Sequence, residues 1–369
     1  MDTNKKVKQV ALSLIDGLNT ENTVKLIEKF ETAENVFKEN LYSIADALDC
    51  KLEYAENMVS QFDSVLKKAD KEFEYVLKNG IKALFITDKE YPYRLSLCSN
   101  APKILYLRGD SNLNSARVIA IVGTRKATEH GKRMCEKLVE DLSNFDDKIV
   151  IVSGLAYGID ITAHKKALEC GVSTIGVMAG GFEHFYPANH LIYARKMVAA
   201  NGSVITEQVK DVVPLSFTFV NRNRIIAGLS DATVVVESTI DGGSLITAKM
   251  ALSYGREVYA FPGRVGERLS EGCNNFIKYN KAGLIENADD LIYFMGWNAN
   301  GCGKNIAMEY LNLDEDEKKI YEIIEKYKTI HHDTLLLKFD GNNKLDSIIL
   351  QMELKGIIER LPGNYLSLL

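Results

Sequence analysis

The sequence has little that would place the protein outside a cell or in a membrane. Its 369 residues include only six cysteines, scattered at positions 50, 98, 135, 170, 273 and 302 without a Cys-x-x-Cys pair. Neither a disulfide framework nor a cysteine zinc site is therefore expected. The first residues lack an apolar signal region, and no run approaches the roughly 18 apolar residues of a membrane span. These absences predict a reduced, cytoplasmic protein.

The chain also lacks an excess of positive charge. Its formal net charge is −5 at pH 7, from 45 Lys and Arg against 50 Asp and Glu. Any site for a polyanion must therefore be a local patch. Hydrophobic residues make up 46% of the chain, which is enough for sizeable cores, and the length predicts two or three domains.

Four segments follow from the patterning. Residues 1–80 have helical periodicity, with a short connection at residues 17–20 and Asn19 or Thr20 as an N-cap; the spacing resembles a helix-hairpin-helix or a small sterile-alpha-motif-like bundle. Residues 81–292 are a lead-in followed by alternating strands and helices, and residues 293–312 are a linker. Residues 313–369 predict three helices and a hairpin with a turn at 362–364, which is the winged-helix pattern.

Buried strands that end in glycine-bearing polar turns dominate residues 117–292. Hydrophobic runs without polar alternation at 118–122, 149–152, 174–178 and 233–236 indicate strands covered on both faces. Extra strands near 203–206 and 257–261 would enlarge the sheet. We therefore expect an α/β fold with an extended Rossmann-like, doubly wound sheet. Ligands bind at the carboxyl ends of such strands, where glycine lets backbone N–H groups approach an anion.

The first turn, Gly123-Thr124-Arg125, precedes a helix that is expected to begin near Glu129. A threonine hydroxyl, a helix start and an arginine fork all suit phosphate. The spacing from Gly123 to Gly131 does not fit the dinucleotide fingerprint, and no Gly-Lys-Ser/Thr follows, so a Walker A loop is excluded.

The second turn begins at Ser153 and contains Gly154 and Gly158, with Asp160 or Thr162 expected to cap the following helix. Tyr157 at its apex could stack on a base, and Lys165 or Lys166 could contact a backbone phosphate. His164 could be an acid–base group, although a histidine in a first helical turn more often bonds a neighbouring loop.

Further turns carry glycines beside aromatic or basic side chains. The Gly180-Gly181-Phe182 turn could stack a nucleotide or cover the sheet edge. Arg222 and Arg224 flank Asn223, and on a helix they point about 200° apart. We expect one arginine to meet phosphate and the other to meet an acidic partner such as Glu237 or Asp241. Gly242-Gly243-Ser244 supplies an anion nest before another helix.

These motifs, in this order and spacing over residues 100–290, resemble the DNA-processing protein A (DprA/Smf) family. The resemblance rests on 123–125, on Ser153-Gly154-Leu155-Ala156-x-Gly158-Ile159-Asp160-x-x-Ala163-His164, on 222–230, on 243–248, and on Pro262-Gly263 followed by 272–274. It implies an extended Rossmann domain that binds single-stranded DNA, forms a homodimer and loads a RecA-type recombinase in natural transformation. The family is not known as an enzyme family, and no metal or cofactor is expected.

The resemblance makes Arg125 the principal phosphate contact, in a pocket shaped by Gly123 and Thr124 and lined by the 154–158 loop and the 180–181 turn. The family often has a basic residue where Tyr157 stands, so stacking on Tyr157 could replace an ion pair with the DNA backbone. A proline is common in the family where Val220 stands, which is a smaller departure. Ile277 and Leu284 are candidates for the dimer surface, which core packing would explain equally well.

The complete expected DNA and phosphate site comprises Gly123, Thr124, Arg125, Lys126, Ser153, Gly154, Tyr157, Gly158, Lys165, Lys166, Gly180, Gly181, Phe182, Arg222, Asn223, Arg224, Gly243 and Ser244. Residues 117–290 carry twenty basic and twenty acidic side chains, so positive charge must be focused at this site. Residues 305–369 carry eight basic and twelve acidic side chains. An acidic winged helix binds duplex DNA poorly, which favours a protein-interaction or autoregulatory role for it.

Two alternatives remain at this point. Rossmann-like nucleoside-monophosphate hydrolases of the cytokinin-activating type also have a late Gly-Gly turn, but theirs resembles Pro-Gly-Gly-x-Gly-Thr-x-x-Glu. Residues 241–248 have no carboxylate where that chemistry needs its acid. A nucleotide sensor without DNA binding would show tight mononucleotide binding and no preference for oligonucleotides.

Overall fold

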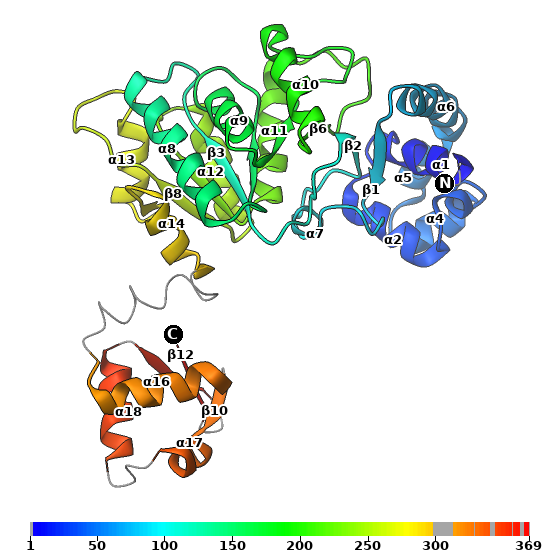
Figure 1. Cartoon of the computed structure of the whole chain (residues 1–369). Helices are drawn as coiled ribbons and strands as arrows, with labels where there is room; N and C mark the ends of the chain where they lie inside the picture. Colours follow the sequence, from blue (N-terminus) through cyan, green and yellow to red (C-terminus); the bar gives the residue numbers. More distant parts are fainter. Residues whose placement is uncertain are drawn as a thin grey trace. The chain divides into compact units, whose positions relative to one another are not determined.

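The computed structural model describes residues 3–297, 313–327, 329–339, 344–355, 357–361 and 365–368. It divides into two compact units, Met1–Leu291 and Ile292–Leu369. The first unit therefore includes the amino-terminal helices together with the large sheet (Figure 1). Most of the expected linker, residues 298–312, lies outside the described residues, and so does the expected turn at 362–364.

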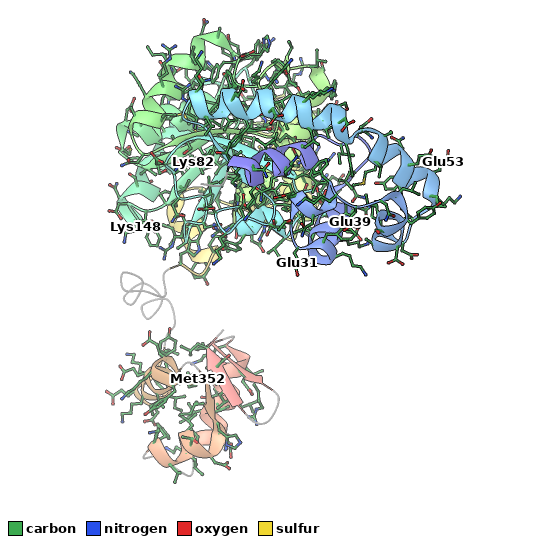
Figure 2. The ribbon with its side chains drawn as sticks, turned by 90° about the vertical axis from the view of Figure 1, so that its right-hand side faces the viewer. Glu31, Glu39, Glu53, Lys82, Lys148 and Met352 are labelled. Atoms are coloured by element: carbon green, nitrogen blue, oxygen red, sulfur yellow. The ribbon has the colours of Figure 1, made fainter. Side chains whose placement is uncertain are left out.

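Six helices form the amino-terminal segment: α1 (Thr3–Ser13), α2 (Thr20–Phe30), α3 (Ala33–Val36), α4 (Leu41–Leu48), α5 (Leu52–Ser60) and α6 (Phe62–Lys78). The cap of α2 is Asn19, whose side chain accepts the N–H of Asn22. Apolar faces of α1 and α6 pack against each other and against the first strand. Figure 2 shows the exposed Glu31 and Glu53 on the outside of this segment.

A nine-stranded sheet forms the centre of the first unit, in the order β1-β2-β6-β5-β4-β3-β7-β8-β9. Strands β6, β5, β4, β3, β7, β8 and β9 are parallel, whereas β1 and β2 pair antiparallel at one edge. The strands are β1 (Lys82–Phe85), β2 (Ile104–Gly109), β3 (Val118–Val122), β4 (Val150–Ser153), β5 (Ser173–Val177), β6 (Ser203–Thr206), β7 (Ala232–Val235), β8 (Glu257–Ala260) and β9 (Gly283–Leu284). This mixed α/β fold with a parallel-dominated sheet is the fold class that the apolar runs predicted.

The winding direction of the sheet reverses between β3 and β7. From β3 the chain steps outward through β4, β5 and β6, then returns to the other side of β3 and steps outward through β7, β8 and β9. Such a switch point leaves a crevice at the carboxyl ends of the two central strands. The accompanying helices are α7 (Tyr93–Ser96), α8 (Glu129–Phe145), α9 (Ile159–Glu169), the short 3-10 turn η1 (Ala188–His190), α10 (Leu191–Ala199), α11 (Ser216–Leu229), α12 (Gly243–Ser253), α13 (Glu271–Lys278) and α14 (Ala288–Phe294).

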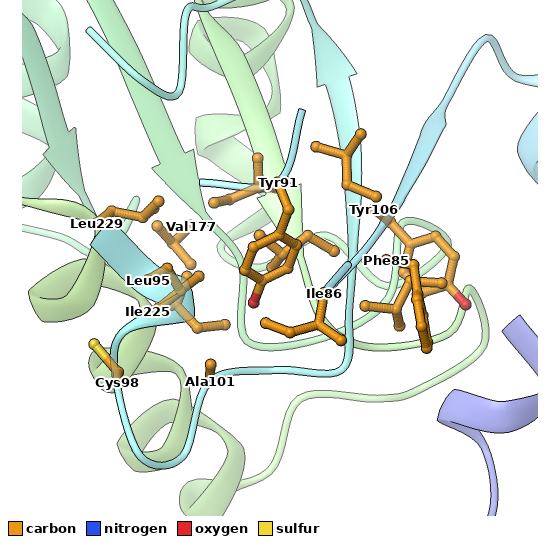
Figure 3. Close-up of a cluster of buried hydrophobic side chains, with 14 of the residues drawn as sticks. Phe85, Ile86, Tyr91, Leu95, Cys98, Ala101, Tyr106, Val177, Ile225 and Leu229 are labelled. Atoms are coloured by element: carbon orange, nitrogen blue, oxygen red, sulfur yellow. The ribbon is translucent and has the colours of Figure 1, made fainter. Parts of the chain in front are cut away.

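The main hydrophobic core joins the amino-terminal helices to the sheet. One cluster of buried side chains runs from Val10 and Phe73 in the helices to the strands and to α11. Figure 3 shows part of it, including Phe85 of β1, Leu95 of α7 and Ile225 of α11. This shared core explains why residues 1–80 belong to the same compact unit as the sheet.

The second unit contains α16 (Glu315–Tyr327), α17 (His332–Lys338) and α18 (Leu345–Leu354). A three-stranded sheet in the order β10-β12-β11 accompanies them, built from β10 (Thr329–His331), β11 (Ile358–Leu361) and β12 (Tyr365–Leu368). Its core includes Ile320, Ile349 and the fully buried Met352, which is labelled in Figure 2. The three helices and the hairpin fall where the sequence predicted them, and β10 adds a strand.

Two local predictions were wrong. Neither Asp160 nor Thr162 caps α9, because the helix begins at Ile159 with Gly158 as an N-cap that has no side-chain hydrogen bond. The expected linker also begins too early, since α14 continues to Phe294. Within the described residues, no helix is both long enough and apolar enough to cross a membrane.

Candidate nucleic-acid interface

A cavity of about 400 Å³ lies at the switch point of the sheet. Loops after β3 and β7 and the first turns of α9, α11 and α12 surround it. Its lining includes Gly123, Thr124, Arg125, Ala156, Asp160, Ser216, Phe219, Arg222, Asn223, Thr239, Gly243 and Ser244. The sequence motifs at 123–125, 222–223 and 243–244 are therefore brought together, although up to 121 positions separate them in the chain.

The loop that carries Arg125 is fixed by the start of α9. Ile159 donates its backbone N–H to the carbonyl of Thr124 at 3.3 Å. Gly158 has a φ of +77°, and a Cβ at this position would lie 2.1 Å from the same carbonyl oxygen. Only glycine combines that conformation with that close approach. The glycine of the second motif therefore serves to position the first motif.

Arg125 is exposed and has no carboxylate partner among the described residues. Its guanidinium lies 5.2 Å from the ring centroid of Phe219, and that ring contacts Tyr186 edge to face with centroids 5.6 Å apart. Lys126 is also exposed. A guanidinium without a carboxylate partner, beside the half-buried ring of Phe219 and close to the exposed ring of Tyr186, suits a phosphate with an adjacent base.

Arg222 lies in the same cavity but is almost fully buried, with 4% of its surface exposed. Its guanidinium donates to the carbonyl oxygens of Gly154, at 2.5 Å, and Val177. Burial lowers the pKa of Arg222 to about 10, while the buried carboxylate of Asp160 opposes that shift. Arg222 therefore holds the loop after β4 to the end of β5. The absence of a side chain at Gly154 leaves the space that the guanidinium of Arg222 occupies.

Arg224 does not face the cavity. It forms an ion pair with Glu207 at 2.5 Å, rather than with Glu237 or Asp241 as expected. Glu237 instead accepts hydrogen bonds from the backbone N–H and the hydroxyl of Thr128 at the start of α8. The i, i+2 spacing places Arg224 away from the face of α11 that carries Arg222. Arg224 is therefore removed from the set of direct contacts.

Helix starts supply the remaining positive potential. The first turns of α9, α11 and α12 all contribute to the cavity lining, and neither α9 nor α12 has a side-chain cap. The helix dipoles favour an anion there, together with the N–H groups at the start of α12, whereas at α9 the N–H of Ile159 already donates to Thr124. Gly243 has open space around it, whereas the Ser244 hydroxyl donates to Ser238 at 2.8 Å.

The structure does not bring Ser153, Gly180, Gly181 or Phe182 into the cavity. Ser153 is fully buried and its hydroxyl donates to the carbonyl of Ile121 at 2.6 Å. The 180–181 turn packs against the segment 209–214, with the N–H of Gly181 donating to the carbonyl of Val212 at 2.9 Å. The expectation that this turn lines the same pocket as Arg125 was therefore wrong.

The second motif separates into buried and exposed residues. His164 is fully buried and its Nδ1 lies 2.7 Å from the hydroxyl of Thr174, which itself donates to the carbonyl of Ile151. Burial lowers the pKa of His164 to about 3, so the ring is neutral and structural. Tyr157 is 43% exposed. Lys165 is exposed, whereas Lys166 lies 3.3 Å from Glu140 in an ion pair, so Lys166 is removed from the set of expected phosphate contacts.

Sequence reasoning missed Phe219 and Ser216 as lining residues. Phe219, Arg222, Asn223 and Ile226 all line the cavity, and their spacing of three, four and seven residues puts them on one face of α11. That periodicity was visible in the sequence. It would have added Phe219 to the site and excluded Arg224.

The dimer candidates lie at the β9 edge of the sheet. Leu284 is 42% exposed on β9, which pairs with β8 alone among the strands that the structure describes. Ile277 on α13 is partly buried against the main core. Among the described residues, no group of three or more His, Cys, Asp and Glu side chains is placed to hold a metal ion.

Fold and cavity together define an α/β protein with a crevice at the switch point of a parallel-dominated sheet. The model of the family described as DNA recombination-mediator protein A matches residues 82–296. The DNA processing protein DprA of Streptococcus pneumoniae is 35% identical over 280 residues, covering 75% of this chain and 93% of that protein. The chain belongs to this family, which confirms the DprA/Smf resemblance.

Solved structures agree with this assignment. The X-ray structure of the Streptococcus pneumoniae protein matches with a TM-score of 0.65 and 33% identity, covering 78% of this chain and 97% of that one. A structure of DNA processing protein A from Helicobacter pylori matches with a TM-score of 0.53 and 29% identity, covering 59% of this chain and 96% of that one. The latter is described as giving insight into the single-stranded DNA binding mode of the Helicobacter protein.

Proposed function

We propose that the protein binds single-stranded DNA at the switch-point cavity and acts as a recombination mediator that loads a RecA-type recombinase during DNA processing or natural transformation. The observation that carries the proposal is Arg125. It is an exposed arginine without a carboxylate partner among the described residues, held at a cavity that the first turns of α9, α11 and α12 help to line.

The side chains around Arg125 favour a single strand over a duplex. Phe219 and the 51% exposed Tyr186 present aromatic rings beside the guanidinium. Base stacking on such rings requires bases that are not already stacked in a helix, and it tolerates any sequence. Arginine and helix N-termini bind the backbone phosphates, which are common to every sequence.

We further propose that two copies pair through the β9 edge. A short edge strand with an exposed Leu284 offers both backbone hydrogen-bonding groups and apolar surface to a second copy. The second unit, with its three helices and three-stranded sheet, is proposed to be a winged-helix domain. Because its sequence is acidic, a protein partner fits it better than duplex DNA.

A gel shift tests the DNA site. Wild type, Arg125→Ala and Lys166→Ala are titrated against single-stranded and duplex oligonucleotides at two salt concentrations. Loss of a charge-assisted phosphate contact should weaken single-strand binding by roughly 10- to 100-fold in Arg125→Ala. Lys166→Ala is the matched control, since its ammonium is already paired with Glu140. Equal binding by wild type and Arg125→Ala would overturn the assignment of this cavity.

The same titration separates the alternatives. Tight mononucleotide binding without a preference for oligonucleotides would favour a nucleotide sensor. Release of free base from nucleoside monophosphates would favour a hydrolase. Asp160 is the one carboxylate in the described cavity lining, and it is buried beside Arg222, so no free acid is in place for that chemistry.

A further inference from the structure

A second group of aromatic and cationic side chains lies near the cavity, on the 153–158 loop, on the turn η1 and on helices α9 and α10. The rings of Tyr157 and His190 meet edge to face with centroids 4.8 Å apart. His190 and Tyr193 follow with centroids 6.5 Å apart. The ammonium groups of Lys165 and Lys196 lie 4.7 and 5.8 Å from the centroid of Tyr193. We call these five residues the α9–α10 patch.

The cations of this patch are available to a ligand. Neither Lys165 nor Lys196 has a carboxylate partner among the residues that the structure describes, and both are exposed. Nearby lysines differ: Lys166 pairs with Glu140, and Lys132 pairs with Glu129 at 2.7 Å. The lysines around Tyr193 therefore retain charge that an incoming anion can neutralise.

The aromatic part of the patch is held in place before any ligand arrives. His190 is 6% exposed, and its Nδ1 donates to the carbonyl oxygen of Leu155 at 2.7 Å. That bond ties η1 to the 153–158 loop. The ring of Tyr157 packs edge to face against the imidazole of His190, while 43% of the surface of Tyr157 stays exposed. Preorganised rings lose little conformational entropy when a base stacks on them.

The patch is joined to the Arg125 cavity by two short stretches of chain. Ala156 lines the cavity, and Gly158 packs against the backbone of Thr124 and Arg125. Tyr157 lies between Ala156 and Gly158 in the chain. Tyr186, which contacts Phe219 beside Arg125, is four residues before His190. Two separate loops thus lead from the cavity to the patch.

We propose that a single strand leaving the Arg125 cavity continues over the α9–α10 patch, with bases stacked on Tyr157 and Tyr193 and backbone phosphates bound by Lys165 and Lys196. This inference rests on the proposed function, because it extends the same binding site. It makes Tyr157 part of a continuous surface rather than an isolated replacement for a basic residue. It also adds Tyr193 and Lys196, which the sequence motifs did not indicate.

Fluorescence anisotropy with oligonucleotides of increasing length tests the proposal on the full chain. Wild type, Tyr193→Ala, Tyr193→Phe, Lys165→Ala and Lys166→Ala are compared on thymidine oligonucleotides from about 4 to about 20 nucleotides, a range that spans common single-strand site sizes. For Tyr193→Ala the loss of affinity should grow with length, reaching roughly 5- to 100-fold on the longest strand. Tyr193→Phe should bind like wild type because it keeps the ring.

The paired lysine variants give the sharper comparison. Lys165→Ala should weaken binding of long strands and flatten its salt dependence, whereas Lys166→Ala should do neither. Long-strand affinities equal to wild type in both Tyr193→Ala and Lys165→Ala would overturn the patch, and so would an equal loss at every length. Failure of wild type to bind any single strand would instead overturn the proposed function, so the two failures are distinguishable.

Discussion

The loop after β3 and the helix α11 both bring arginines to the switch point, but the arginines have different surroundings. Arg125 on the loop is exposed and lacks a carboxylate partner in the described structure. Arg222 on α11 is buried against two carbonyl oxygens and Asp160, and Arg224 is paired with Glu207. Residue type alone therefore does not indicate a ligand contact. Burial and existing partners decide which arginine can bind phosphate.

Replacing Arg222 should have the largest effect on stability. Arg222→Ala leaves Asp160 as a buried, uncompensated charge and frees two buried carbonyl groups, which should cost about 3–5 kcal/mol of unfolding free energy. Urea unfolding followed by circular dichroism measures it. Arg125→Ala is the matched control and should change the unfolding free energy by less than about 0.5 kcal/mol. Similar losses in the two variants would remove the distinction between the arginines.

Gly158→Ala should disturb the loop that presents Arg125. A Cβ would lie 2.1 Å from the carbonyl oxygen of Thr124 at a φ of +77°. The loop must then shift, at a cost of about 1–3 kcal/mol. Single-strand binding should weaken together with stability, which thermal melting and anisotropy would show. Wild-type binding in a stable Gly158→Ala protein would show that the loop position is unimportant.

Breaking the ion pair of Arg224 should lower stability without affecting DNA binding. Glu207→Gln removes one charge from a pair that is largely shielded from water, and loss of a hydrogen bond between charged groups should cost about 1.5–3 kcal/mol. Oligonucleotide affinity, measured well below the melting temperature, should equal that of wild type. A large loss of affinity in this folded variant would return Arg224 to the binding site.

A further prediction concerns the pH dependence of stability, at a site away from all three arginines. Glu72 on α6 accepts the backbone N–H of Lys210, in the segment that leads to α11, at 2.9 Å. Burial raises the pKa of Glu72 from 4.5 to about 7. The folded protein therefore retains a proton that the unfolded chain loses above pH 4.5, so this group lowers stability as pH rises from 4.5 to 7.

Glu72→Gln keeps an acceptor for Lys210 but does not titrate. The variant should gain melting temperature relative to wild type between pH 5 and pH 8, as thermal scans at both values would show. A difference between the two proteins that does not change with pH would contradict the raised pKa.

Much of the fold could be predicted from the sequence because uninterrupted apolar runs specify buried parallel strands. The runs at 118–122 and 149–152 fall on β3 and β4. The residues of the site were harder to predict from the sequence. A motif indicates which residues lie near a crevice, but not which of their atoms are already hydrogen-bonded within the protein. Ser153 and Arg222 belong to motifs of the site, yet both are buried and bonded to carbonyl groups. Their partners are distant in sequence, so no local pattern could indicate them.

Helical periodicity could have corrected part of the site. Phe219, Arg222, Asn223 and Ile226 share one face of α11, and all line the cavity. The 180–181 turn is different, because its position depends on the segment 209–214 that packs against it. That contact joins two loops about 30 residues apart, and only the folded chain shows it.

The salt dependence of single-strand affinity tests the central role of Arg125 most directly. Anisotropy titrations of wild type and Arg125→Ala across a series of salt concentrations give the slope of log affinity against log salt for each protein. If Arg125 neutralises one backbone phosphate, the slope should become shallower by about 0.7 in Arg125→Ala, with an unchanged melting temperature. Identical slopes and affinities in the two proteins would contradict the account.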